Sequence, residues 1–229
     1  MTALHVAPCS HKAAKTAVER WHYSQRLPVG RMRRFGVWED GSFRGALVFS
    51  RGANNKLGNS LGLGPGQYCE LTRVAMRAHK SEVSRVIRVC LALLKRTEPE
   101  MLAVFSFADP AQGHTGGIYK AGNWHYHGRT AGSTEFYLGG RWVHNREATA
   151  GAFGSKCRYS KHDRQSAAKR KTPGKHKFVM WLDKHDRRKY AYLCKPYPCA
   201  SPIEGPTVLG RDEGAEPILA LHGGGDVKA

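Results

Sequence analysis

The stretch SEVSRVIRVCLALLKRTEPEMLAVFSFA, residues 81–108, decides the fold class. Its first part repeats apolar side chains at spacings of three and four, which predicts an amphipathic helix over residues 81–95 that begins at Ser81 and ends before Pro99. The second part, residues 101–108, is short and almost continuously apolar, as in a strand that is covered on both faces. A helix that leads directly into such a strand indicates an α/β protein with helices packed on its sheet.

Strands and helices alternate through the middle of the chain, whereas strands follow one another near both ends. This order indicates one α/β domain built on a central mixed sheet, with helices on both faces. The chain has 229 residues, of which 41% are hydrophobic, and this is enough for one such domain with a substantial core. We expect strands at 3–8, in the hairpin 35–49, and at 68–76, 124–129, 135–143, 177–183 and 190–195, with helices at 11–23 and 115–121.

The net charge points to a polyanionic partner. Lys and Arg number 37 against 18 Asp and Glu, which gives +19 at pH 7. Such an excess favours binding to nucleic acid over an anionic membrane, and a merely basic protein is the third alternative. Residues 155–177 hold nine Lys or Arg and one acid, Asp163, so we expect either an arm that binds DNA phosphates or a solvated loop. The candidate DNA-binding side chains are Lys169, Arg170, Lys171 and Lys175.

Residues 203–229 differ in composition from the rest of the chain. They are rich in Gly and Pro, hold two basic and five acidic side chains, and show no amphipathic period. We therefore expect residues 1–202 to form the folded domain and residues 203–229 to be a mostly disordered tail whose removal leaves folding nearly intact.

The cysteine pattern and the lack of long apolar segments favour a cytoplasmic protein. Six cysteines are scattered without a Cys-x-x-Cys pair, which favours reduced thiols over a disulfide framework. No apolar run approaches the ~20 residues of a membrane span, and we find no signal-peptide pattern. We expect a protein of the cytoplasm that does not act at a membrane.

Residues 106–127, SFADPAQGHTGGIYKAGNWHYH, crowd chemically active side chains after the most apolar strand. In open α/β sheets, ligands bind where loops leave the carboxyl ends of the strands. Asp109, Gln112 and His114 lie in such a loop, and the helix that follows offers free backbone N–H groups. Taken singly, each residue has a structural explanation, such as ending the strand for Asp109 or packing in the core for Tyr119. Together they favour an active site.

A family resemblance adds to this interpretation. Residues 118–129, IYKAGNWHYHGR, resemble the tyrosine-containing helix and following strand of the GNAT superfamily of N-acetyltransferases. Over roughly residues 10–200, the segments HYSQRLPVGR, FGVWEDGSFRGALVF, ELTRV, SFADPAQGHTGGIYKAGNWHYHG and KPYP together look like the Mom DNA-modification proteins of bacteriophages. The resemblance implies a phage-encoded, acetyltransferase-like enzyme that converts adenine in double-stranded DNA to an N6-carbamoylmethyl form and so protects it from host restriction.

The chemistry that the resemblance implies assigns roles to these residues. The adenine N6 amine is a weak nucleophile, so the enzyme must flip the base, hold its edge and remove a proton as the new bond forms. Asp109 is suited to accept a hydrogen bond from N6, His114 to carry a proton, and Tyr119 to protonate the leaving group, as a tyrosine often does for coenzyme A in the superfamily. The other catalytic candidates are Ser106, His22, Tyr23 and Ser24, and the substrate-binding candidates are Pro110, Gln112, Trp124, Tyr126 and Arg73.

The identity of the donor stays open. Acetyltransferases usually carry a Gln/Arg-x-x-Gly-x-Gly/Ala turn before the long helix, where it grips the coenzyme A diphosphate, whereas residues 77–85 here read RAHKSEVSR, without glycine. A phosphate can still bind at a helix N-terminus, here through Lys80, Ser81 and Ser84. Acetyl-CoA or another small acyl or glycyl donor is the cofactor that the resemblance implies.

Twelve histidines raise the question of a metal ion. His125 and His127 share one face of a predicted strand, because side chains alternate along strands. No spacing in the chain matches a specific metal-binding motif, so we assign no metal ligands, and iron is the metal to consider if the donor is activated oxidatively.

Two other functions are compatible with the sequence. One is an N-acetyltransferase that acts on a protein or RNA amine. The other is a DNA-binding phage regulator without catalytic activity.

Overall fold

The computed structural model describes residues 3–52, 56–150, 159–198 and 207–209. They belong to two compact units: unit 1 comprises residues 1–132 and 173–205, and unit 2 comprises residues 133–172 and 206–229. Each unit has its own sheet.

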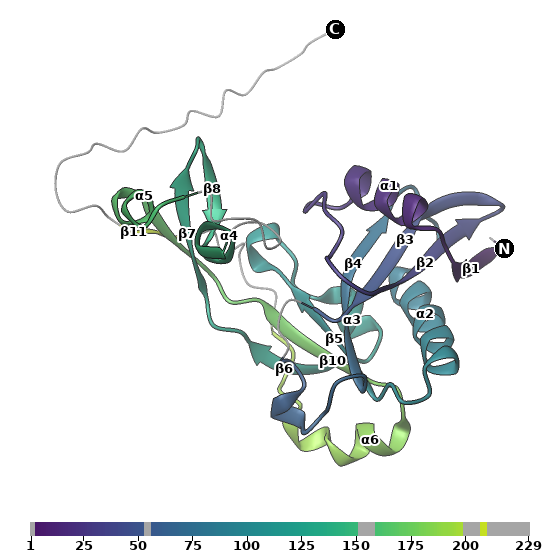
Figure 1. Ribbon diagram of the computed structural model, residues 1–229. Helices are drawn as coiled ribbons and strands as arrows, with labels where there is room; N and C mark the ends of the chain where they lie inside the picture. Colours follow the sequence, from purple (N-terminus) through teal and green to yellow (C-terminus); the bar gives the residue numbers. More distant parts are fainter. Residues whose placement is uncertain (1–2, 53–55, 151–158, 199–206, 210–229) are drawn as a thin grey trace, which may run out of the picture. The chain divides into compact units, whose positions relative to one another are not determined.

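Unit 1 is built on a seven-stranded sheet in the order β1-β2-β3-β4-β5-β10-β6 (Figure 1). β4 and β5 run parallel, and the other neighbouring strands run antiparallel. The sheet is therefore mixed, as predicted. The strands are β1 (Leu4–Pro8), β2 (Met32–Glu39), β3 (Ser42–Ser50), β4 (Tyr68–Met76), β5 (Ala103–Ala108), β6 (His125–Arg129) and β10 (His176–Trp181).

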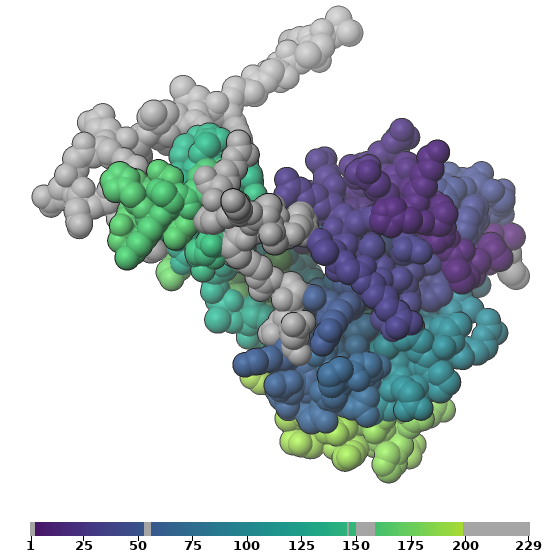
Figure 2. All heavy atoms as spheres, in the orientation of Figure 1, coloured from purple at the N-terminus to yellow at the C-terminus, as the bar shows by residue number. Residues whose placement is uncertain are grey.

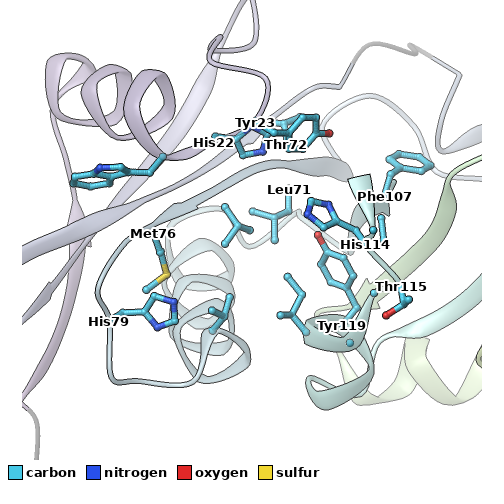
Figure 3. Close-up of a pocket in the computed structure, with 18 residues that line it drawn as sticks. His22, Tyr23, Leu71, Thr72, Met76, His79, Phe107, His114, Thr115 and Tyr119 are labelled. Atoms are coloured by element: carbon cyan, nitrogen blue, oxygen red, sulfur yellow. The ribbon is translucent and has the colours of Figure 1, made fainter. Parts of the chain in front are cut away.

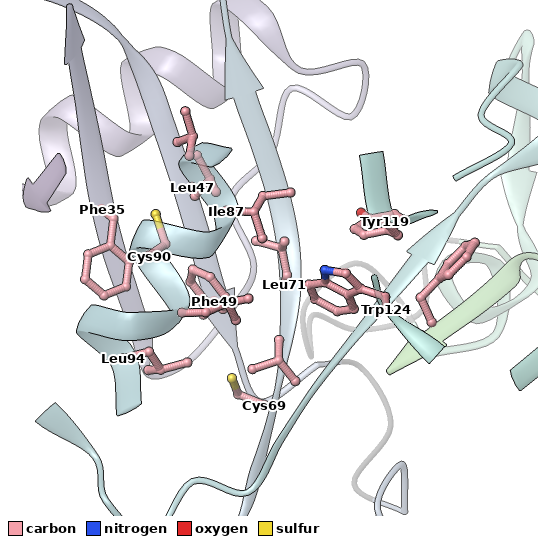
Figure 4. Close-up of a cluster of buried hydrophobic side chains, with 14 of the residues drawn as sticks. Phe35, Leu47, Phe49, Cys69, Leu71, Ile87, Cys90, Leu94, Tyr119 and Trp124 are labelled. Carbon is pink, nitrogen blue, oxygen red and sulfur yellow. The ribbon is translucent and has the colours of Figure 1, made fainter. Parts of the chain in front are cut away.

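Helices cover both faces of this sheet. α1 (His11–Trp21) begins at Ser10, whose side chain accepts a hydrogen bond from the Ala13 N–H, and packs on one face. α2 (Val83–Thr97) packs on the other face through the apolar stripe that the sequence shows (Figure 4). The predicted mixed α/β class with helices on both faces is confirmed. The remaining elements of unit 1 are α3 (Gly117–Ala121), α6 (Lys184–Lys189) and the 3-10 turns η1 (Asn59–Leu61), η2 (Pro110–Gln112) and η4 (Ala191–Leu193).

Alternation along β3 explains how one sheet serves two cores. Ala46 and Val48 face α1, whereas Leu47 and Phe49 face α2, because successive side chains of a strand point to opposite faces. The α2 side holds the larger side chains, and Figure 4 shows Phe49 and Leu47 beside residues of α2.

The strand predicted over residues 190–195 is wrong. This segment contains η4, and both Tyr190 and Leu193 pack against the cluster around Trp181. A spacing of three places two side chains on the same side of a 3-10 turn, whereas a strand would point them to opposite faces. The Tyr190 ring stacks on Trp181 with centroids 4.2 Å apart, which fixes the turn on the sheet.

Unit 2 was not predicted as a separate body. It is a four-stranded antiparallel sheet in the order β11-β9-β7-β8, with a small core of Leu138, Val143 and Ala148. The single strand expected over 135–143 is instead a hairpin that turns at Gly139 and Gly140, both with positive φ. Its elements are β7 (Ser133–Leu138), β8 (Arg141–His144), α4 (Asn145–Ala150), α5 (Lys161–Ser166), β9 (Lys169–Thr172) and β11 (Thr207–Leu209).

Two predictions about segments change accordingly. The basic segment 155–177 is not one arm, because its described part contains α5 and β9 of unit 2 and then enters unit 1. Within the expected tail 203–229, Thr207–Leu209 form β11, which pairs with β9. These three residues are therefore ordered, whereas the sequence predicted a mostly disordered tail. Residues 155–158, 203–206 and 210–229 lie outside the described residues.

No helix among the described residues is long and apolar enough to cross a membrane. The cysteines in the described part of the chain, Cys9, Cys69, Cys90 and Cys194, are free thiols.

Candidate active site

A cavity lies where the parallel strands β4 and β5 separate. The two strands pair only over Tyr68–Glu70 and Ala103–Phe105. Beyond these residues β4 continues along β3 and β5 along β10, and the space between them is a hollow of about 630 Å³ (Figure 3). It opens at the carboxyl ends of both strands, where the sequence places the chemically active loop.

Tyr119 enters this cavity from α3. Gly116 precedes the helix at φ 85°, and a Cβ there would come within 2.3 Å of the Phe178 ring, so the close packing of α3 on β10 requires glycine. The Tyr119 hydroxyl lies 2.7 Å from Ser106 Oγ, and this oxygen donates to the Leu71 carbonyl at 3.0 Å. The two predicted residues Ser106 and Tyr119 are therefore directly bonded.

The environment of Tyr119 keeps its proton in place. Burial raises the pKa of Tyr119 to about 12, and the bond to Ser106 offsets only part of this effect. At neutral pH the phenol is protonated, so it is suited to act as an acid and not as a base. Ser106 has a single proton to donate. When that proton goes to the Leu71 carbonyl, Tyr119 is the donor to Ser106, and when it goes to Tyr119, the phenol proton is free for the cavity.

His22 and Tyr23 line another side of the cavity, and Ser24 is hydrogen-bonded to His22. The Ser24 N–H donates to His22 Nδ1 at 3.1 Å, and Ser24 Oγ lies 2.9 Å from the same atom. Because a backbone N–H only donates, Nδ1 is the acceptor and neutral His22 carries its proton on Nε2. Burial lowers the pKa of His22 to about 4, and the nearby Arg73, His114 and Lys175 act in the same direction. His22 is thus a neutral N–H donor at neutral pH.

The structure joins the two walls through aromatic contacts. The His22 ring stacks on Tyr23 at 4.4 Å between centroids, and Tyr23 meets His114 edge-on at 5.7 Å. In Figure 3, His22 and Tyr23 lie on one side of the cavity and His114 and Tyr119 on another. Residues that are far apart in the sequence therefore face one cavity.

Asp109 has two fixed partners. Its Oδ1 accepts from the Ala111 N–H at 3.1 Å and so caps η2, which is the structural role considered as the alternative. Its Oδ2 lies 2.8 Å from Lys175 Nζ. The Asp109 carboxylate thus caps the turn that follows β5 and forms an ion pair with Lys175 at the carboxyl end of that strand.

Lys175 forms an ion pair with Asp109 beside the cavity, and its role in DNA binding stays a prediction. The Lys175 N–H donates to Thr130 Oγ1 at 2.9 Å, and the Thr130 N–H donates to the Lys175 carbonyl at 2.9 Å, so the backbone of Lys175 is held against the end of β6. Burial acts to lower the pKa of Lys175, but the nearby Tyr23 and Asp109, together with the hydrogen bond to Asp109, raise it overall. Lys175 therefore stays charged.

Arg73 supports the His22 wall instead of presenting a free guanidinium. Its Nε donates to the Arg26 carbonyl at 2.8 Å and its Nη1 to the Thr72 carbonyl at 2.6 Å. Burial lowers the pKa of Arg73. The bidentate anion binding expected from the sequence is not available while these bonds persist.

Trp124 and Tyr126, expected to stack on a base, are core residues. Trp124 is 1% exposed and packs edge-on against Tyr119, and the Tyr126 hydroxyl lies 2.9 Å from His176 Nδ1. Neither ring lines the cavity. The sequence missed the aromatic side chains that do line the cavity, Trp21 and Phe107. Phe107 was not predicted to line a site, because its strand was expected to be covered on both faces.

Pro110 and Gln112 lie in η2, beside the cavity and not on its surface. Pro110 is buried and Gln112 is exposed to solvent. Their predicted role in holding a substrate therefore has no support in the side-chain positions.

The turn before α2 does not fit a diphosphate as in acetyltransferases. The N–H groups of Lys80 and Ser81 donate to the two carboxylate oxygens of Glu39 at 2.8 and 2.7 Å. Burial acts to raise the pKa of Glu39, yet these hydrogen bonds lower it to about 2, so the buried carboxylate is ionised. A built-in anion already occupies the two amides, and a second anion there would be repelled. All three predicted residues, Lys80, Ser81 and Ser84, line one small hollow at the start of α2.

A metal centre has no ready ligand set. Among the described residues, no three His, Cys, Asp or Glu side chains lie close enough together to hold a metal ion. His125 and His127 lie on one face of β6 as predicted, with ring centroids 6.4 Å apart.

The fold and the cavity define a class of protein before any comparison. A mixed α/β sheet opens a cavity between diverging parallel strands, and its walls carry a protonated phenol, a neutral imidazole donor and, beside them, an ion-paired carboxylate. These groups are typical of a protein that transfers protons to and from a bound organic ligand.

The chain belongs to the Mom protein family, whose model matches residues 3–199. It is 27% identical over 205 residues to the methylcarbamoylase Mom of Escherichia phage Mu, covering 85% of this chain and 83% of that relative. The resemblance inferred from the sequence is confirmed for the family.

Similar solved structures include N-acetyltransferases. The spermidine/spermine N-acetyltransferase SpeG of Vibrio cholerae, in complex with manganese ions, has a TM-score of 0.46 and 11% identity and covers 81% of this chain and 96% of its own. A Bacillus subtilis acetyltransferase in complex with CoA has a TM-score of 0.44 and 11% identity and covers 80% of this chain and 100% of its own.

Proposed function

We propose that this protein is a transferase that modifies the N6 amine of adenine in double-stranded DNA, in the cytoplasm of the bacterial host. The proposed product is the N6-carbamoylmethyl base, which protects phage DNA from restriction. The name of the phage Mu relative supports this product, and the net charge of +19 supports a DNA substrate. The observation that carries the proposal is a cavity lined by His22 and Tyr119, with the Asp109–Lys175 pair directly after its lining residue Ala108.

The acceptor side of the reaction is assigned to Asp109. Adenine is flipped from the duplex, and its N6 forms a bond to the methylene carbon of a carbamoylmethyl donor. N6 loses a proton in this step, and the Asp109 carboxylate is suited to receive it. Lys175 holds the carboxylate in one orientation, because its ammonium group is bonded to Oδ2 at 2.8 Å.

The donor side is assigned to Tyr119 and His22. The bond between the methylene carbon and the leaving group breaks, and the leaving group takes the proton of Tyr119, whose pKa of about 12 keeps that proton available at neutral pH. The Nε2–H of neutral His22 is suited to donate to the amide oxygen of the carbamoylmethyl group. The donor itself is a small acyl or glycyl compound, because Glu39 occupies the amides that a coenzyme A diphosphate would need.

Nucleoside mass analysis tests the proposal. The native protein and a Tyr119→Phe variant are expressed in a bacterium, and the host DNA is digested and examined for altered deoxyadenosine. Carbamoylmethyl deoxyadenosine with the native protein alone supports the proposal. Unmodified DNA together with acetylated lysine or RNA would establish an N-acetyltransferase instead, and tight duplex binding without any product would establish a regulator.

A further inference from the structure

Outside the candidate active site, α2 presents a stripe of arginines to a groove. Arg85, Arg88 and Arg96 follow one another at helical spacing, with the small Ala92 between them. They line a hollow of about 720 Å³ on unit 1 that also includes Met180 and Leu182 of the neighbouring β10 segment. We name this surface the arginine groove. In the space-filling view, the yellow-green residues that include α6 form the lower edge of unit 1, near the teal residues that include α2 (Figure 2).

We propose that the arginine groove binds the phosphate backbone of duplex DNA. This inference rests on the proposed function for the identity of the polyanion. It does not depend on the chemistry in the cavity.

The three arginines carry unneutralised charge. Within the described part of the chain, Arg85, Arg88 and Arg96 form no ion pair or hydrogen bond, whereas Arg33 is paired with Glu98 and Arg170 with Glu135. Glu82 is the one acidic side chain among the described residues that line the groove. Three free guanidinium groups along one hollow raise the local concentration of anions.

The position of Arg85 on α2 is unfavourable for stability alone. The first turn of α2 holds no acidic residue, and Arg85 is its third residue. The N-terminus of a helix carries partial positive charge and prefers anionic side chains, so Arg85 is repelled by the helix that bears it. A phosphate in the groove relieves this repulsion, which gives the arrangement a function that folding does not supply.

The length of the stripe favours a polymer over a single nucleotide. From Arg85 to Arg96 the helix rises about 16 Å at ~1.5 Å per residue. A mononucleotide gathers its phosphates at one end, whereas duplex DNA presents a phosphate about every 1.7 Å along its axis. A line of guanidinium groups of this length matches the polymer.

The groove also lies close to the candidate active site. A smaller hollow of about 360 Å³ shares Ser84 and Ala121 with the groove and Gly117 and Ile118 with the cavity. The groove and the cavity thus meet at α3, a helix of five residues. The start of α2 lies on the side of the cavity, through Val83, whereas the other end of the groove lies beside the first residues of β5, because Met180 pairs with Val104.

The salt dependence of duplex binding, measured without donor, tests the proposal. The triple variant Arg85→Gln, Arg88→Gln, Arg96→Gln should flatten the slope of log affinity against log salt by about 0.9 for each lost contact, up to about 2.7. The matched control, Lys12→Gln, Lys15→Gln, Arg20→Gln, removes the same charge from α1 on the opposite face of the sheet. The control should change the slope much less. If both triple variants flatten the slope equally, the effect reflects the overall charge of the protein and not the groove, and the proposal is overturned.

A single reversal separates stability from binding. Arg85→Glu places an acid in the first turn of α2 and should raise the melting temperature by about 1–4 °C. It should weaken duplex binding at the same time. Unchanged binding by this well-folded variant would contradict the groove.

Binding of coenzyme A by calorimetry covers the alternative source of phosphate. If coenzyme A binds the native protein but not the triple variant, while the DNA slopes agree, the groove holds a nucleotide and the proposal is overturned. The proposed function can fail independently, because a protein that leaves DNA unmodified can still show the altered slope.

Discussion

The ammonium group of Lys175 lies 2.8 Å from Asp109 Oδ2, which joins the turn before β10 to the loop after β5. Since β5 and β10 are neighbouring antiparallel strands, His176 pairs with Ala108, and the residues just outside this pair meet at the same end of the sheet. The pair therefore follows from strand register. It places one positive charge beside the carboxylate for which we propose a role in proton removal.

Asp109→Asn should abolish adenine modification and leave duplex binding nearly unchanged. The amide keeps the cap on η2, because its oxygen can still accept from the Ala111 N–H. It loses the negative charge that receives a proton, and a placed general base contributes a factor of about 10²–10⁴. The measurement is the fraction of modified deoxyadenosine alongside a melting curve. A folded variant with near-native modification would remove Asp109 from the mechanism.

The companion change Lys175→Met discriminates between the two roles considered for this lysine. As a positioning residue it should lower modification at saturating DNA, and its effect should not add to that of Asp109→Asn in a double-mutant cycle. As a phosphate contact it would instead flatten the salt slope by about 0.9 and leave the rate at saturation unchanged. Lys177→Met, a neighbouring lysine in β10, is the matched control.

The hydrogen bond between Ser106 and Tyr119 leads to predictions for both residues. Tyr119→Phe should remove the proposed acid and reduce modification strongly with little effect on DNA binding. Ser106→Ala frees the phenol from its partner, so the pKa of Tyr119 should rise further, because the Ser106 bond lowers it. Spectrophotometric titration of the tyrosines reports this shift. An unchanged titration curve in Ser106→Ala would show that the bond is absent in solution.

Two half-buried histidines predict how stability depends on pH. Burial lowers the pKa of both His22 and His127 to about 4, below the ordinary value of 6.5. Between these values the unfolded chain binds protons that the folded protein does not, so the free energy of unfolding should fall as the pH is lowered from 6.5 towards 4. Urea titrations between pH 6.5 and 5 measure this slope before Glu39, with a pKa of about 2, contributes.

His127→Gln is the variant for that experiment, because His127 is outside the candidate active site. It should make stability less dependent on pH in this window and keep modification activity at pH 7.5. A pH dependence identical to that of the native protein would contradict the shifted pKa of His127.

The basic residues of β9 should divide into two kinds. Arg170 donates to Glu135 Oε2 through Nε at 2.8 Å, and its guanidinium lies 4.4 Å from the Trp142 ring, so Arg170→Gln should destabilise unit 2 by roughly 1–2 kcal/mol. Lys171 is exposed, and Lys171→Gln should change stability by less than ~0.5 kcal/mol while weakening DNA binding. Calorimetric unfolding and the salt slope measure the two effects. Equal destabilisation by both changes would be inconsistent with this division.

The sequence predicted what local periodicity determines. The stripe on α2 and the apolar run of β5 lie within one residue or two of their predicted segments, because burial of one face imposes its period on consecutive residues. Ser106, Asp109 and Tyr119 were predicted together because β5, the loop after it and α3 follow one another in the sequence. The contact of Lys175 with Asp109 was not predicted, because the charge of Lys175 places it in a basic run and only strand register brings it to Asp109. Unit 2 was missed because β6 and β10 pair directly, and a segment inserted between paired strands leaves no periodic signal of its own.

The last prediction concerns the segment that composition marked as a tail. Thr207–Leu209 pair with Lys169–Lys171 as β11 at the edge of the unit 2 sheet. Deleting residues 203–229 should therefore expose β9 as a new edge strand, and the backbone amides of β9 should exchange with deuterium faster. Deleting only residues 210–229 should leave that exchange unchanged, since this shorter deletion keeps β11.

Two controls make this comparison decisive. Val208→Pro in the full chain removes the N–H of the central β11 residue and should mimic the longer deletion. Modification activity should survive in the 210–229 deletion, because all candidate active-site residues lie before residue 199. If the amides of β9 exchange at the same rate in both deletion variants, β11 does not contribute to the sheet. The folded part of the chain then ends before residue 203, as its composition predicts.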